Sequence, residues 1–120
     1  MSPSEVIRAD CLKRNTEPDA LLKHLLWLVH GNEAQILHAG NTVLLLRFFG
    51  DGFAELHLFT EDKPIALAKN VKKLIAVIRK SNLKRVYGNA DNKSIVSLLT
   101  ILGVDVGLPD LKNYNWMAIV

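Results

Sequence analysis

The sequence of 120 residues has little cysteine and no long apolar run. Its single cysteine, Cys11, excludes an intramolecular disulfide and favours a cytosolic setting. No apolar stretch approaches the ~20 residues of a spanning helix, and residues 1–5 lack the basic and apolar regions of a signal peptide. We expect no metal site, because the spacings of the histidines match no ligand pattern. These histidines are His24, His30, His38 and His57.

Acidic residues are absent between Lys63 and Asp91. Residues 1–62 carry five basic and nine acidic side chains, whereas residues 63–120 carry ten basic and three acidic ones. Such a basic stretch suits the phosphates of a nucleotide cofactor or a nucleic acid. The solvated face of an amphipathic helix has the same composition. Because no aromatic residue is interleaved with these cations, a nucleic-acid partner is the weakest of the three interpretations.

The hydrophobic content of 49% is enough for one core and predicts a single domain over residues 1–120. Alternating apolar and polar residues over Phe53–Thr60 indicate a strand with two different faces. Apolar residues from Ile65 to Ile78 recur at helical spacing, after a proline that suits a first helical turn. The distance from this strand to the next, Lys84–Ala90, predicts a parallel crossover.

The other expected elements complete a sheet with helices. Two glycine-containing turns, at 40–41 and 50–52, predict three consecutive antiparallel strands. The patterns predict strands over Ser4–Asp10, Ala34–Ala39, Thr42–Phe49, Val104–Gly107 and Tyr114–Val120, and helices over Ala20–His30 and Lys93–Leu102. We therefore expect an α/β (α+β) fold with a mixed, mostly antiparallel central sheet and helices on both faces.

Three burial expectations accompany this layout. The wide apolar arc of the helix over 20–30 predicts that much of it is buried, and we expect Trp27 and Trp116 in the core. Cys11 is expected to be a small buried residue. The strand that ends at Val120 is expected to be an exposed edge through which two subunits can pair.

Two local patterns stand beside this order of elements. The first, Lys63-Pro64-Ile65-Ala66-Leu67-Ala68, follows the strand over 53–60 and opens a helix. The second runs from Asn92 to Val104 and keeps Asn92, Leu98, Leu102 and Gly103 in register with Asn-x-x-Ala-x-x-Leu/Phe-Tyr-x-x-x-Gly-Phe. With these patterns the chain resembles the GNAT (Gcn5-related N-acetyltransferase) fold over nearly its whole length.

The resemblance implies a site for acetyl-CoA. In that family a loop of the form Arg/Gln-x-x-Gly-x-Gly/Ala holds the pyrophosphate with backbone N–H groups at a helix start. Here Pro64 removes one N–H group, and Ala66 adds a Cβ at the first glycine position. The cofactor-binding residues that the resemblance implies are Leu58, Phe59, Thr60, Lys63, Ala66, Ala68 and Asn92.

The resemblance also implies catalytic residues. An acetyltransferase needs a base for the attacking amine, and family members often carry a glutamate on the corresponding strand. Glu55 is therefore the candidate base, and His57 a candidate relay or binder, although both can equally face solvent. The family tyrosine that often protonates the CoA thiolate is Leu99 here, which cannot donate a proton. Tyr114 is the candidate replacement for this acid.

The departures at Pro64, Ala66 and Leu99 favour a protein that keeps the fold with little or no catalysis. The chain most resembles the compact GNAT-like proteins of short-tailed bacteriophages, on its layout and on Leu-His-Leu-Phe-Thr at 56–60. This narrower resemblance implies a virion component or host-takeover factor that acts through a protein partner, in the virion or the host cytoplasm. The alternative is an active acetyl-CoA-dependent N-acetyltransferase for an amine of a small molecule or protein.

Overall fold

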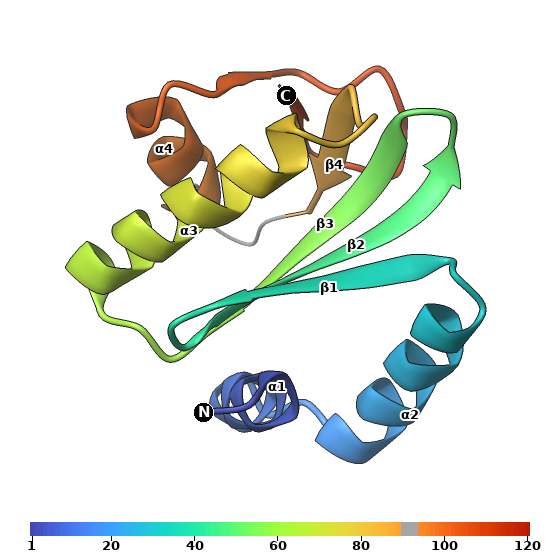
Figure 1. Cartoon of the computed structure of the whole chain (residues 1–120), viewed down its shortest axis with the longest axis vertical. Helices are drawn as coiled ribbons and strands as arrows, with labels where there is room; N and C mark the ends of the chain where they lie inside the picture. Colours follow the sequence, from blue (N-terminus) through green and yellow to red (C-terminus); the bar gives the residue numbers. More distant parts are fainter. Residues whose placement is uncertain (90–93) are drawn as a thin grey trace.

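The computed structural model describes residues 1–89 and 94–120 and contains one mixed sheet between two pairs of helices (Figure 1). Asn92, which was expected to bind a cofactor, and the start of the expected helix at Lys93 lie outside these residues. No helix in the described ranges has the length and apolarity to cross a membrane. The elements are α1 (Pro3–Lys13), α2 (Pro18–His30), β1 (Ala34–Ala39), β2 (Thr42–Gly50), β3 (Phe53–Thr60), α3 (Pro64–Arg79), β4 (Arg85–Gly88), α4 (Ser94–Ile101), β5 (Asp105–Gly107) and β6 (Trp116–Ile119).

The strands follow the order β1-β2-β3-β4-β6-β5 across the sheet. β1, β2 and β3 pair antiparallel, and β3 pairs parallel with β4, which confirms the predicted hairpins and crossover. β6 lies between β4 and β5, so the expectation of an exposed edge at the C-terminal strand is wrong. Within the described residues the edges of the sheet are β1 and β5.

Each face of the sheet has its own apolar core. α3 and α4 cover one face, and the predicted stripe of α3 supplies Val71, Leu74, Ile75 and Ile78 to that core. α1 and α2 cover the opposite face, as Figure 1 shows. Leu99 of α4 is 1% exposed, so its side chain belongs to the core. The mixed sheet with helices on both faces is therefore confirmed.

The strand expected over Ser4–Asp10 is wrong, because these residues lie in α1. Ser2 and Glu5 form a reciprocal capping box, in which the Ser2 hydroxyl accepts from the Glu5 N–H and Glu5 accepts from the Ser2 N–H. Pro3 occupies the first helical position, where a missing N–H costs nothing. The buried residues recur at helical spacing and are Val6, Ile7, Asp10 and Cys11. The expected burial of Cys11 is confirmed.

α2 buries less of its apolar surface than its composition predicts. Leu25 and Leu28 face the sheet at helical spacing, but Leu26 is 67% exposed and Trp27 is 70% exposed. The expected burial of Trp27 is wrong because one stripe of the helix contacts the core, while the wider arc has no element over it in the described structure. Trp116 is 3% exposed, as expected.

The contact between Gly88 and Trp116 gives the first testable prediction. A Cβ at Gly88 would overlap the indole of Trp116, whereas a Cβ at Gly107 would meet nothing within 4 Å. Because both glycines lie on strands, Gly88→Ala should lower the free energy of unfolding by about 1–3 kcal/mol through overpacking. Gly107→Ala is the matched control. Equal urea midpoints for the two variants would contradict this packing.

Candidate active site

The central feature of the site is a cleft where β3 and β4 separate. Within the described residues the two strands pair over Phe53–Glu55 and Arg85–Tyr87 only, while β3 continues to Thr60. Past this short ladder a cavity of about 480 Å³ opens. β3 forms one wall with residues 56–60, and the other elements contribute Leu67, Asn89, Ser94, Ile95 and Trp116. Three of the predicted cofactor residues, Leu58, Phe59 and Thr60, therefore line the same cavity.

One residue near the N-terminus of α3 lines this cleft. The N-cap of this helix is Lys63, which makes no capping hydrogen bond, and the first turn carries no acidic residue. Leu67, in the next turn, lines the cleft. A helix start with this charge suits an anion, because its first N–H groups have no partner within the helix. Ala66 and Ala68 lie on this helix but are not among the described residues that line the cleft.

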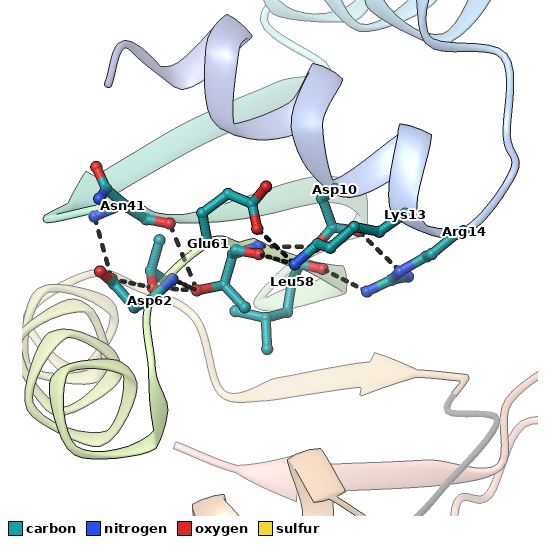
Figure 2. A network of polar contacts seen from close by, with 9 residues as sticks. Asp10, Lys13, Arg14, Asn41, Leu58, Glu61 and Asp62 are labelled. Atoms are coloured by element: carbon teal, nitrogen blue, oxygen red, sulfur yellow. Dashed lines mark hydrogen bonds and ion pairs between the residues drawn. The ribbon is translucent and has the colours of Figure 1, made fainter.

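Asp62, which precedes this helix, directs its carboxylate away to the β1–β2 turn (Figure 2). Its Oδ2 accepts from the Asn41 N–H at 3.1 Å, the Thr42 hydroxyl at 2.7 Å and Asn70 Nδ2 at 2.8 Å. Burial raises the pKa of Asp62, but the hydrogen bonds from Thr42 and Asn70 outweigh it and lower the pKa below its ordinary value. The Asp62 carboxylate therefore has a structural role, in which it connects the β1–β2 turn to α3.

Glu55 of β3 is the centre of a hydrogen-bonded cluster. Its Oε2 accepts from Arg47 Nη2 at 2.9 Å and from the Tyr114 hydroxyl at 2.6 Å, and its Oε1 contacts His57 Nε2. Burial raises the pKa of Glu55, but hydrogen bonds from Arg47, Tyr114 and His57 outweigh it and lower that pKa to about 2. Glu55 is therefore ionised at neutral pH and acts as an acceptor.

The ionisation of Glu55 fixes the direction of the hydrogen bonds that it receives. Since the carboxylate can only accept, His57 donates its Nε2–H, and Nδ1 is the acceptor whenever the ring is neutral. Burial, together with the Glu55 carboxylate, raises the pKa of Tyr114, so its phenol keeps its proton. The Tyr114 ring is held against Tyr87 and Phe49, with centroid distances of 5.4 and 6.0 Å. The structure thus unites Glu55, His57 and Tyr114, while their catalytic roles stay predictions.

A second cavity of about 270 Å³ lies on the α1–α2 face of the sheet. Its walls include Glu55 and Arg47 from the cluster and leucines from α2. Arg14, His57 and Phe59 line both this cavity and the β3–β4 cleft. His57 therefore borders both cavities.

The last turn of α1 contacts the open edge of β3 near the cleft, as Figure 2 shows. Asp10 Oδ2 accepts from the Thr60 N–H at 2.8 Å, and Arg14 Nη2 donates to the Leu58 carbonyl at 3.4 Å. Arg14 Nε lies 2.8 Å from Asp10 Oδ1, and Lys13 Nζ donates to the Thr60 carbonyl at 3.0 Å. In a parallel sheet, one residue of the neighbouring strand bonds the carbonyl of one residue and the N–H of the residue two positions later. The Leu58 carbonyl and the Thr60 N–H are such a pair. The Asp10–Arg14 pair takes the place of that strand.

Sequence reasoning found the β3 residues of the site and missed their partners. Asp10 and Arg14 were missed because their segment was expected to be a strand, although their i,i+4 spacing and the capping box were visible. Arg47 reaches Glu55 through the β2–β3 register, which pairs the two residues directly. Nothing in the local sequence signals that pairing. Among the described residues no three His, Cys, Asp or Glu side chains come together as a metal site.

Solved structures with a similar fold are acetyltransferases. Tetrahymena Gcn5 matches over 98% of this chain and 84% of its own, with a TM-score of 0.58 and 12% identity. A chimera of the spermidine N-acetyltransferase SpeG from Vibrio cholerae with hSSAT matches over 98% of this chain and 90% of its own. Its TM-score is 0.58 and its sequence identity is 12%. YncA, a putative acetyltransferase from Salmonella typhimurium with its cofactor acetyl-CoA, matches over 86% of this chain and 71% of its own. Its TM-score is 0.55 and its sequence identity is 12%.

These likenesses show that the chain has the GNAT fold, as its sequence predicts. No family model matches the sequence, and no curated protein matches it significantly. The narrower resemblance to bacteriophage proteins stays a prediction.

The lowered pKa of Glu55 predicts a pH-dependent stability. Because the folded-state pKa is depressed from 4.5 to about 2, its contribution is present above pH 4.5 and is lost as the pH falls towards 2. Glu55→Gln should lower the free energy of unfolding at pH 7 by about 1–3 kcal/mol, since the three donors lose a charged acceptor. The substitution should also reduce the difference between the free energies of unfolding at pH 6 and at pH 3, as measured by urea unfolding.

Glu33→Gln is the control, because Glu33 is exposed. A Glu55→Gln variant whose stability changes with pH as steeply as that of the unmodified protein would show that the cluster does not hold Glu55 ionised.

Proposed function

We propose that the protein binds acetyl-CoA in the cleft between β3 and β4 and transfers the acetyl group to an amine. The observation that carries this proposal is the position of His57, which is oriented by Glu55 and lines both cavities. An acyl donor in the cleft and an amine in the second cavity would meet at this side chain. The likeness to acetyltransferase structures, one of them with acetyl-CoA, supports the same reaction class.

The residues at the start of α3 fit the phosphate end of acetyl-CoA. The N-terminus has no capping side chain and no acidic residue in its first turn, and the adjacent Lys63 is exposed. Pro64 removes one donor, but the N–H groups of Ile65 and Ala66 remain outside the helical ladder. The thioester would lie further along the cleft, near residues 56–60, and would supply the activated acetyl group.

In this proposal His57 is the base and Glu55 is the group that orients it. A carboxylate with a pKa of about 2 is a weak base for an amine, whereas the second ring nitrogen of His57 can accept a proton. Glu55 holds the Nε2–H of His57, so Nδ1 accepts the proton that the amine loses. The resulting imidazolium is stabilised by the adjacent carboxylate. These roles reverse the assignment of Glu55 as the base.

The same imidazolium can return its proton to the departing thiolate. Leu99 is buried and has no proton to give, and the Tyr114 proton is engaged with Glu55. His57 therefore serves as base and then as acid, which removes the need for a separate tyrosine. Tyr114 acts through Glu55 as a positioning residue.

The second candidate function is cofactor-free protein binding, as a virion component or host-takeover factor. One observation favours this function. Side chains of α1 already form hydrogen bonds with the Leu58 carbonyl and the Thr60 N–H, so these two groups are not open to an extended ligand in the cleft. Pro64 and Ala66 at the start of α3 also favour this second candidate, because Pro64 removes an N–H donor and Ala66 adds a Cβ where a phosphate would approach the backbone. Cofactor binding separates the two candidates.

Titration calorimetry with acetyl-CoA and with CoA tests the cofactor. We expect micromolar affinity, and Lys63→Ala should weaken it several-fold because the cation beside the α3 N-terminus is lost. Lys112→Ala removes an exposed cation from a distant loop and should leave the affinity unchanged. No heat at millimolar acetyl-CoA would reject the acetyltransferase proposal in favour of cofactor-free binding.

The role of His57 is tested by thiol release from acetyl-CoA with a panel of amines. His57→Gln should lower turnover by about 100-fold or more while leaving the affinity for CoA unchanged, since only the proton acceptor is removed. His38→Gln changes an exposed histidine of β1 and serves as the control. Equal turnover for both variants would exclude His57 as the base.

A further inference from the structure

The cavity on the α1–α2 face has the size and the lining of a site for one small amphiphilic molecule. Its volume of about 270 Å³ lies just below the range of sites for drug-sized ligands. Its apolar lining consists of Leu21, Leu25, Leu28, Leu45 and Phe59, and Leu45 lies directly opposite His57 in the β2–β3 register. Its polar lining includes Asp10, Arg14, His24, Arg47, Glu55 and His57, and Arg14 and His57 also line the β3–β4 cleft. A ligand that fits has an apolar body and one polar end.

Both carboxylates in this cavity are already committed. Asp10 is 3% exposed, accepts from the Thr60 N–H and pairs with Arg14. Glu55 accepts from Arg47, Tyr114 and His57. No further carboxylate lines the cavity within the described ranges 1–89 and 94–120. A polycationic ligand would therefore find no anion that is not already neutralised.

Arg14, by contrast, keeps donors that no described residue accepts from. Within residues 1–89 and 94–120 its guanidinium uses Nε towards Asp10 and Nη2 towards the Leu58 carbonyl, which leaves three of its five N–H groups without a partner there. Its side chain is 61% exposed, so these groups are accessible to a ligand. A planar guanidinium with free donors matches the two oxygens of a carboxylate. The open donors thus favour a ligand group that accepts hydrogen bonds, such as a carboxylate.

We propose that this cavity binds a small molecule with an apolar body and one carboxylate, of the chemical class of an apolar α-amino acid. The carboxylate is held by Arg14, and the side chain contacts the leucines of α2. The neighbouring amine lies towards His57, a placement that rests on the proposed function. In the transfer the amine nitrogen bonds to the acetyl carbon, the carbon–sulfur bond breaks, and the amine proton passes through His57 Nδ1 to the sulfur.

Binding of L-leucine to the full chain without CoA tests the cavity independently of catalysis. Amide chemical shifts should report millimolar or tighter binding of L-leucine, at least tenfold weaker binding of L-leucinamide, and no binding of spermidine. Arg14→Gln should weaken L-leucine binding at least tenfold, and Arg14→Lys should restore part of it. Arg8→Gln is the matched control, because Arg8 lies on the same helix, pairs with Asp19 and lines a different cavity. Thermal midpoints confirm that each variant is folded.

Four results would each overturn the inference. They are absence of L-leucine binding, equal affinities for L-leucine and L-leucinamide, preferential binding of spermidine, and equal effects of Arg14→Gln and Arg8→Gln. If L-leucine binds as expected while acetyl-CoA does not, the assignment of this cavity stands and the proposed transfer fails. If acetyl-CoA binds and spermidine is the preferred acceptor, the transfer stands and the assignment fails.

Discussion

The short parallel ladder between β3 and β4 is the constraint on which the rest of the molecule depends. Three residues of each strand pair before the strands separate, and β4 ends at Gly88 against the indole of Trp116. A longer ladder would satisfy more backbone groups but would close the cleft. Within the described residues no strand pairs with residues 56–60 of β3 on that side. The cavity opens there, and His57 is one of the residues that line it.

The unpaired half of β3 needs other partners, because buried backbone groups must be hydrogen-bonded. α1 supplies them with side chains: Asp10 and Arg14 together provide the acceptor and the donor of one strand residue. The same two side chains line the second cavity, so one helix both completes the sheet and shapes the site.

The sequence predicted the elements whose signals are local. The turns at 40–41 and 50–52 placed β1, β2 and β3, and the stripe of α3 placed its buried face. α1 was mistaken for a strand because its short apolar pair, Val6-Ile7, has no clear period, although Ser2 and Glu5 carried the helical signal. The alternation along β3 brought Glu55 and His57 to one face, but their chemistry depends on Arg47 and Tyr114. Arg47 lies opposite Glu55 because of the β2–β3 register, and Tyr114 reaches Glu55 from a loop 59 residues away in the sequence. The residues around Glu55 in the sequence do not indicate either contact.

If the separation of β3 from β4 creates a site for a CoA thioester, CoA should bind in that cleft. A map of backbone amide shifts on titration with CoA tests this most directly. We expect saturable shifts confined to residues 56–60, to 65–67 at the start of α3 and to 94–95 at the start of α4. Shifts centred on β1 or on the exposed face of α2, or none at millimolar CoA, would contradict it.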